Sequence, residues 1–237
     1  MPRVSLSDIR YGLRHPLQAW RYLQHRDTIS YETCARYLPA DPVIVEAGAY
    51  DGSNTRDFCR FWPECHVYAF EPVPSAYDRL LQVATEFPRQ IHPQHMALGD
   101  ETRISEMHVS VIGSSGGEQS SSLLAPSATH QEFPFIGFRS ETISVKVTKL
   151  AEWAKANNVR RVDFLWLDLQ GMELAAMKGC GDLLSGVHAI HCEVQNIELY
   201  SGSPLYADLS SWLKSRGFSA VYEAVFRRGG NVLFAKT

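Results

Sequence analysis

The stretch Val43-Ile44-Val45-Glu46-Ala47-Gly48-Ala49-Tyr50-Asp51-Gly52-Ser53-Asn54-Thr55 decides the fold of this chain. A short apolar strand pattern over 43–47 leads into a turn with two glycines, and a helix is expected from Thr55. Glycine lets a backbone approach a ligand without a Cβ in the way, and a helix start presents N–H groups to a carboxylate or phosphate. The stretch therefore predicts the strand, turn and helix start of a nucleotide-type pocket.

A second strand pattern, 66–70, ends in Glu71. An acid at the tip of the second strand, about 20 residues after the glycines, is where such folds bind the two hydroxyls of a ribose. We therefore predict that Glu71 binds a ribose, a role that suits more than one adenosine cofactor.

Strand and helix patterns alternate along most of the remaining chain. Strands are expected at 43–47, 66–70, 91–96, 162–167 and 187–192, with a closing hairpin at 219–222 and 231–235. Helices are expected at 55–62 and 74–86, after a cap at Thr148, after the strand end at 168–173 as far as about 184, and at 205–215. This alternation predicts an α/β fold with a parallel sheet and right-handed crossovers. The division expected is a helical segment at 1–40 and one domain at 41–237.

One segment, 101–147, interrupts the alternation. Strand patterns at 102–111 and 142–147 flank a glycine- and serine-rich stretch, 113–122. A connection of this length is usually functional, so we expect an insertion that forms a lid or a binding loop.

Composition narrows the class of protein. The 237 residues are 45% hydrophobic and carry a net charge of −3, which singles out neither nucleic acid nor a membrane surface as partner. The five cysteines form no C-x-x-C pair, as is typical of reduced thiols. Without an apolar signal or spanning stretch, the expectation is a cytoplasmic protein with no stable membrane insertion.

Acids gather at the predicted strand ends. In an open parallel sheet, ligands bind beyond the carboxyl ends of the strands. The residues expected there are Glu46, Glu71, Met96, Asp168 and Glu193. Because an unpaired buried charge is expensive, this pattern favours a ligand with hydroxyls and a positive charge, or a metal ion.

Motifs at these positions resemble those of a known family. The series Glu46-x-Gly48-Ala49, Phe70-Glu71-Pro72, Ala97-Leu98-Gly99-Asp100 and Leu167-Asp168-x-x-Gly171-x-Glu173, with the later Glu193, resembles the FkbM family of S-adenosylmethionine-dependent methyltransferases over about 43–235. The resemblance implies a Rossmann-like seven-stranded class I methyltransferase sheet, mostly parallel with an antiparallel edge hairpin and helices on both faces. It also implies O-methylation of a sugar, glycan or secondary-metabolite hydroxyl.

The resemblance also implies roles for individual residues. Cofactor contacts fall on Glu46, Gly48, Ala49, Tyr50, Asp51, Gly52, Asn54, Thr55, Glu71, Met96, Ala97, Asp100 and Asp168, and acceptor contacts on Gln170, Gln195, Ser121 and Ser122. We assign Asp168 as the general base, with Glu193 as the alternative, and place Glu173 at the floor of the site. Glu173 alternatively only favours its helix start through the dipole. If a divalent cation activates the acceptor, Asp168 and Glu193 are its expected ligands.

Three positions depart from the family pattern. The chain has Glu46 and Tyr50 where the family usually has Asp and Asn, and Gln170 where it most often has Glu. If that carboxylate activates the acceptor in relatives, this chain must use Asp168 or Glu193.

Two other functions fit parts of the pattern. An NAD-dependent oxidoreductase also places an acid at the second strand tip, but the turn here is Gly-x-x-x-Gly, and the dinucleotide fingerprint needs G-x-G-x-x-G. A non-catalytic S-adenosylmethionine-binding protein is the other alternative, motivated by Gln170.

Overall fold

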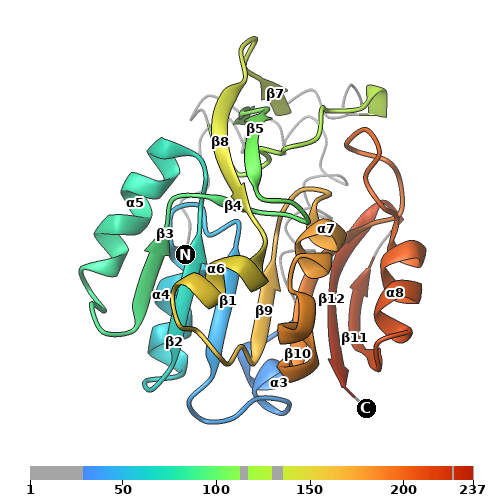
Figure 1. Ribbon diagram of the computed structural model, residues 1–237. Coiled ribbons are helices and arrows are strands. Elements are labelled where there is room, and N and C mark those ends of the chain that lie inside the picture. The colour runs from blue at the N-terminus through green and yellow to red at the C-terminus, as the bar shows by residue number, and fades with distance from the viewer. Residues whose placement is uncertain (1–28, 113–116, 130–135, 226, 237) are drawn as a thin grey trace, which may run out of the picture.

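A seven-stranded sheet forms the centre of the computed structural model, which describes residues 29–112, 117–129, 136–225 and 227–236 (Figure 1). The strands lie in the order β11-β12-β10-β9-β1-β2-β3. They span Val43–Ala47 (β1), His66–Phe70 (β2), Ile91–Gln94 (β3), Phe164–Leu167 (β9), Ala189–Gln195 (β10), Phe218–Val225 (β11) and Gly229–Lys236 (β12). The strand order runs outward from β1 in one direction and from β9 in the other. The switch point, where such sheets bind ligands, therefore lies between β1 and β9.

Helices cover both faces of this sheet. They span Tyr31–Ala35 (α3), Ser53–Phe61 (α4), Pro74–Ala84 (α5), Leu150–Ala156 (α6), Glu173–Lys178 (α7) and Tyr206–Lys214 (α8), with a 3-10 helix at Gly181–Gly186. Phe58 of α4 and Leu80 of α5 belong to the core on one face, and Trp153 of α6 and Leu213 of α8 to the core on the other. Because both faces are covered, a ligand reaches the strands from their ends.

The burial of the strands explains their sequences. All four residues of β9 are buried, as parallel strands covered on both faces require. In β1, Ile44 joins the core on the α4 side and Val45 the core on the α6 side. Strands β3, β2, β1, β9 and β10 pair in parallel, and β12 runs antiparallel to β10 and β11. The predicted mostly parallel sheet with an antiparallel edge hairpin is confirmed.

The predicted insertion folds into two small sheets of its own. Its strands are Ala97–Leu98 (β4), Arg103–Met107 (β5), Ser110–Ile112 (β6), Ile136–Phe138 (β7) and Ile143–Thr148 (β8). One sheet has the order β4-β8-β5, and the other pairs β6 with β7. Figure 1 shows β5, β7 and β8 projecting above the central sheet. Met107, Val145 and Val147 form a third core with Ala76 of α5, which attaches the insertion to the main sheet's helices.

Several predicted boundaries were wrong for local reasons. The predicted strand 91–96 ends at Gln94, because Ala97 and Leu98 pair with β8 in the small sheet. The predicted strand 102–111 is two strands, since β5 pairs with β8 and β6 pairs with β7. Thr148 was expected to cap a helix, but it is the last residue of β8, and Lys149 is the N-cap.

Three further corrections concern one strand and two helices. Helix α4 begins at Ser53, two residues before the expected start. The fifth strand of the prediction, 187–192, runs instead from Ala189 to Gln195, because β12 pairs with it as far as Gln195 and Gly229. Glu193 therefore lies within the strand rather than beyond it. The single helix predicted to end at about 184 is α7 followed by the separate 3-10 helix.

The N-terminal prediction falls mostly outside the described residues. Positions 1–28 are not among them, and α3 is the part of the predicted 1–40 segment that the structure shows. The boundary at residue 40 stays a prediction. Within the described residues, no helix has the length and apolar character needed to cross a bilayer. All five cysteines are buried.

A Gly48→Ala substitution should strongly destabilise the fold. Gly48 has φ +84°, and a Cβ there would lie 2.0 Å from the backbone oxygen of Asp168. The left-handed backbone and the clash together should lower the free energy of unfolding by about 2–5 kcal/mol, measured by urea denaturation. Gly217→Ala is the matched control, since Gly217 has φ +82° and no atom within 4 Å of the added Cβ. Equal losses in the two variants would contradict the close approach of β1 and β9.

Candidate cofactor and active site

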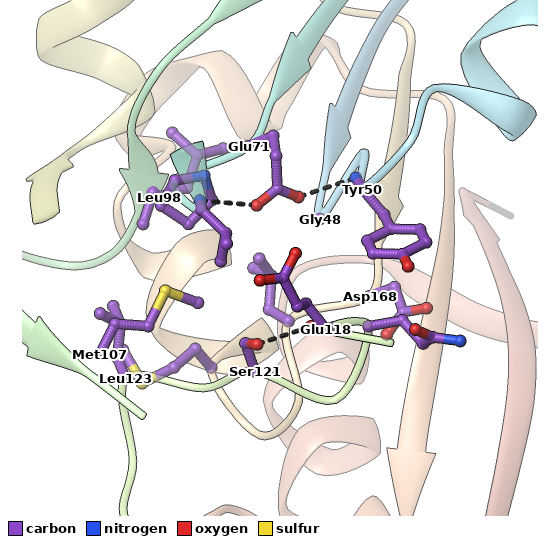
Figure 2. Close-up of a pocket in the computed structure, with 15 residues that line it drawn as sticks. Gly48, Tyr50, Glu71, Leu98, Met107, Glu118, Ser121, Leu123 and Asp168 are labelled. Carbon is purple, nitrogen blue, oxygen red and sulfur yellow. Dashed lines mark hydrogen bonds between the residues drawn. The ribbon is translucent and has the colours of Figure 1, made fainter. Parts of the chain in front are cut away.

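A pocket opens at the carboxyl ends of β1 and β9, where the sheet topology places a ligand (Figure 2). It is lined by Gly48, Tyr50, Glu71, Pro72, Val73, Ala97, Leu98, Met107, Glu118, Gln119, Ser121, Leu123, Asp168, Leu169 and Met172. One part of this lining is apolar, and the other carries three carboxylates. The residues come from the ends of the central strands and from the insertion.

The turn after β1 forms one wall. The backbone N–H groups of Gly48 and Ala49 donate to the carbonyl oxygen of Phe70, at 3.0 and 3.1 Å, so the turn is fastened to the tip of β2. Tyr50 adopts φ +50°, a left-handed conformation that Asn adopts more readily than Tyr. The guanidinium of Arg79 lies 4.9 Å from the centre of the Tyr50 ring, which fixes the ring at the pocket wall.

Glu71 is held at the pocket by backbone hydrogen bonds. Its side chain is 5% exposed, and its carboxylate oxygens accept from Tyr50 N at 2.7 Å and Val73 N at 2.8 Å. Burial raises the pKa of Glu71 to about 7, although the two N–H groups oppose the shift. A carboxylate has about four acceptor positions, so capacity remains for the hydroxyls of a ribose.

Glu118 is a second buried carboxylate in the lining, and it comes from the insertion. Its oxygens accept from Ser75 Oγ at 2.6 Å, Arg139 at 2.5 Å and Arg79 at 3.4 Å. Figure 2 shows this carboxylate between Glu71 and Asp168. The contacts fasten the insertion to α5 across the pocket.

Asp168, directly after β9, lies beside Glu193, which is within β10. The last registered pair of these strands is Leu167 and Cys192, so the two acids follow in the same register. Gln170 donates from Nε2 to Asp168 Oδ1 at 2.6 Å and to Glu193 Oε2 at 2.7 Å. Asp168 is exposed at the pocket and Glu193 is half-buried. The two candidate bases therefore share one amide.

Glu173 is buried and is not among the residues that line the pocket. It is 4% exposed, and it accepts hydrogen bonds from Leu169 N at 2.8 Å and Gly171 N at 3.0 Å. Burial raises its pKa to about 7. These contacts hold the turn that carries Asp168 and Gln170. They favour a positioning role for Glu173, and the catalytic assignment stays a prediction.

Glu46 is fully buried beneath the glycine turn. It accepts a hydrogen bond from the hydroxyl of Thr55, and its other oxygen, Oε1, has no hydrogen-bond partner among the described residues. Burial raises its pKa to about 8; the Thr55 hydroxyl opposes this shift, and the charges of Asp51, Glu71 and Asp168 add to it. Glu46 and Thr55 therefore support the pocket from behind its lining.

The remaining predicted cofactor residues lie around the pocket. Asp51 accepts from the N–H and hydroxyl of Ser53 at the start of α4, and Gly52 faces Leu80 and Val83 of α5. Asn54 and Asp100 are exposed, and Met96 is half-buried. Of the thirteen predicted cofactor residues, those that line the pocket are Gly48, Tyr50, Glu71, Ala97 and Asp168.

The predicted acceptor residues connect the insertion to the strand tips. Ser121 lines the pocket and donates to the carbonyl oxygen of Glu118 at 2.6 Å. Ser122 donates to the carbonyl oxygen of Gln170 at 2.8 Å. Gln195 is 5% exposed and accepts weakly from Ser203 at 3.4 Å. Ser122 therefore joins the insertion to the turn after β9, and Ser121 holds the insertion's own loop.

Sequence reasoning missed much of the insertion's contribution. Glu118 is the one acid in the stretch 113–122, a signal that could have singled it out. The apolar residues Met107 and Leu123 gave no comparable signal, because ordinary core positions look the same in a sequence. Tyr200 was missed as well; its side chain is fully buried and its hydroxyl lies 2.9 Å from Gln170 Oε1.

No group of three or more His, Cys, Asp or Glu side chains suited to a metal ion occurs in the described part of the chain. A cation held by the chain at Asp168 and Glu193 would thus take two protein carboxylates.

The sequence of the chain matches a known domain across the same region. A profile of the methyltransferase FkbM domain matches residues 46–220, which include the end of β1, the pocket lining and β10. The chain belongs to the FkbM methyltransferase family. It is an S-adenosylmethionine-dependent methyltransferase, and the NAD-dependent alternative is not supported.

Two relatives are similar to the chain in sequence, and one solved structure is similar in fold. The chain is 28% identical over 207 residues to 2-O-methyltransferase NoeI of Sinorhizobium fredii, covering 86% of this chain and 82% of the relative. It is 22% identical over 195 residues to hexuronic acid methyltransferase AglP of Haloferax volcanii, covering 81% and 72%. The solved structure of a fibrillarin/Nop5p complex is similar in fold, with a TM-score of 0.50 and 14% identity, covering 84% of this chain and 75% of that chain.

The pocket residues fit the cofactor of this FkbM chain. Gly48 brings backbone close to the site, and Glu71 offers a buried carboxylate for the ribose hydroxyls. Val73, Leu98 and Met107 are apolar and suit an adenine ring. The negative charge of Asp168 suits a sulfonium cation.

A Glu71→Ala substitution should weaken cofactor binding. Losing hydrogen bonds between a carboxylate and ribose hydroxyls costs about 1.5–3 kcal/mol. Calorimetry with S-adenosylhomocysteine should show this loss, and Glu86→Ala, which removes an exposed carboxylate paired with Arg56, should bind as the native chain does. Unchanged affinity in Glu71→Ala would refute the ribose assignment.

Glu46 should make the stability of the ligand-free protein depend on pH. The folded-state pKa of about 8 lies above the ordinary 4.5, so the folded chain keeps a proton that the unfolded chain releases. Its contribution to stability is therefore complete below about pH 4.5 and is lost as the pH rises through 8.

Urea denaturation at pH 5 and pH 8 checks this effect. The native chain should lose unfolding free energy between pH 5 and pH 8, and Glu46→Gln should not lose this contribution. The unfolding free energy of Glu46→Gln minus that of the native chain should therefore rise by on the order of 2–4 kcal/mol from pH 5 to pH 8. Glu64→Gln, at an exposed position, should show the same pH dependence of unfolding free energy as the native chain. Parallel curves for all three proteins would mean that Glu46 is ionised in the folded state at neutral pH.

Proposed function

We propose that this chain transfers a methyl group from S-adenosylmethionine to a hydroxyl of a sugar or glycan acceptor. The observation that carries the proposal is the carboxylate pair Asp168, which follows β9, and Glu193, which lies in β10; both accept from the amide of Gln170 beside the cofactor pocket. A sugar hydroxyl is a weak acid, so its methylation needs a base at this place. The names of the relatives, a 2-O-methyltransferase and a hexuronic acid methyltransferase, support an acceptor of this class.

Asp168 is the residue that we assign as general base. It lines the pocket and is exposed, so an acceptor hydroxyl has access to its carboxylate. The cofactor supplies an activated methyl group when bound. The chain's part is to align the acceptor oxygen and take up its proton, which a base within hydrogen-bond reach accelerates by about 10²–10⁴-fold. Glu193 is the alternative base on the neighbouring strand.

Two loops provide the proposed acceptor wall. Residues 117–129 of the insertion run beside residues 196–203, which follow β10. Ser127 N donates to Leu199 O at 2.9 Å, and Ser201 N donates to Ala125 O at 2.8 Å. Because these loops are joined to each other next to Glu193, they form one surface at the side of the pocket where an acceptor would enter.

Methyl transfer from labelled S-adenosylmethionine to a panel of sugars, uronic acids and glycans tests the proposal. The native chain should label at least one hydroxylated acceptor. Asp168→Asn should lower turnover by about 10²–10⁴-fold while S-adenosylhomocysteine binding changes little, because the variant loses the base but keeps the pocket. Asp182→Asn, an exposed change on the 3-10 helix, should retain full turnover.

The other outcomes are equally informative. Full turnover in Asp168→Asn would remove the base assignment and direct the same test to Glu193→Gln. Cofactor binding without transfer to any acceptor would support the alternative of a non-catalytic binding protein.

A further inference from the structure

Gln170 occupies an unusual position between two carboxylates. Its Nε2 lies 2.6 Å from Asp168 Oδ1 and 2.7 Å from Glu193 Oε2. An amide nitrogen carries two N–H donors, and each carboxylate receives one of them. Two acids from neighbouring strands therefore converge on one atom.

The orientation of this amide is fixed by chemistry. Ionised carboxylates only accept hydrogen bonds, so the nitrogen must face them and Oε1 must face the other way. On that side, Gln170 Oε1 lies 2.9 Å from the hydroxyl of Tyr200, which also lies 2.8 Å from the carbonyl oxygen of Ser120. Since Tyr200 is fully buried, the amide has a rigid support.

The backbone of Gln170 is fixed as well. It adopts φ +52° and is followed by Gly171 at φ +99°, whose added Cβ would lie 2.8 Å from that of Ser203. The carbonyl oxygen of Gln170 accepts from Ser122 Oγ at 2.8 Å, and Glu173 accepts from Gly171 N at 3.0 Å. The turn, the insertion and α7 thus all determine where the side chain at 170 points.

Convergence of carboxylate oxygens on one point is the arrangement that hard divalent cations use in proteins. Here the converging groups meet an uncharged amide. We propose that Gln170 is a positioning residue whose side-chain amide takes the place of a bridging cation between Asp168 and Glu193, and so holds both carboxylates at the acceptor side of the pocket. The effect on catalysis in this inference rests on the proposed function.

Replacing Gln170 tests this placement through Mn²⁺ binding, which needs no acceptor. Gln170→Glu has nearly the same shape and would bring a third carboxylate to the convergence point. It should bind one Mn²⁺ with a Kd of about 10⁻⁴–10⁻³ M, at least about tenfold tighter than the native chain, as calorimetry or electron paramagnetic resonance would show. The matched control is Gln82→Glu on the exposed side of α5, which should bind as the native chain does.

A second variant covers the case that Gln170→Glu does not fold. Gln170→Ala adds no charge and removes the amide from between the acids, so it should bind Mn²⁺ several-fold tighter than the native chain. In a turnover assay it should lower kcat by about tenfold or more, with S-adenosylhomocysteine affinity changed less than about threefold, because the base is displaced and the cofactor pocket is kept.

The readouts separate the two proposals. Equal Mn²⁺ affinity in the native chain and in the folded Gln170 variants would overturn the inference, since the carboxylates would then not converge on this side chain. A native chain that methylates no acceptor would end the proposed function, and the Mn²⁺ titrations would still decide the role of Gln170.

Discussion

Burial of carboxylates against backbone N–H groups is the constraint on which the rest of this structure depends. Glu71 holds the turn after β1, and Glu173 holds the turn after β9. An unsatisfied buried carboxylate would be very costly, so each of these turns has one favoured conformation. The two turns lie on either side of the switch point of the sheet. The pocket therefore keeps its shape because the two buried acids that hold its turns need these backbone hydrogen bonds.

A buried carboxylate with hydrogen-bond partners also holds the insertion in place. Glu118, buried in the lining, contacts Ser75 and Arg79 of α5 and Arg139 after β7. Buried ion pairs add little net stability, but breaking one leaves an uncompensated charge. This cluster consequently fixes where the insertion lies rather than how stable the protein is. Residues of the insertion, which precedes β9 in the chain, therefore line the pocket together with the turn that follows β1.

Negative charge accumulates at this end of the sheet, and the cofactor's sulfonium offers the complement. Glu71, Glu118 and Asp168 all line the pocket, while Glu46 lies behind it and keeps its proton near neutral pH, because burial raises its pKa to about 8. The arginines near the pocket are engaged by Glu118.

The sequence by itself determined the parallel sheet, its hairpin edge and the acids at its strand tips, because apolar runs, glycine turns and chain order are local properties. It did not determine which acids face the pocket. In the structure, Glu46 and Glu173 are buried, Glu118 lines the pocket, and Gln170 bridges Asp168 and Glu193. Those outcomes depend on register and on contacts between segments distant in the chain, such as Tyr200 with Ser120. Only the tertiary structure decides them, since a side chain's role here follows from which neighbour satisfies its hydrogen bonds.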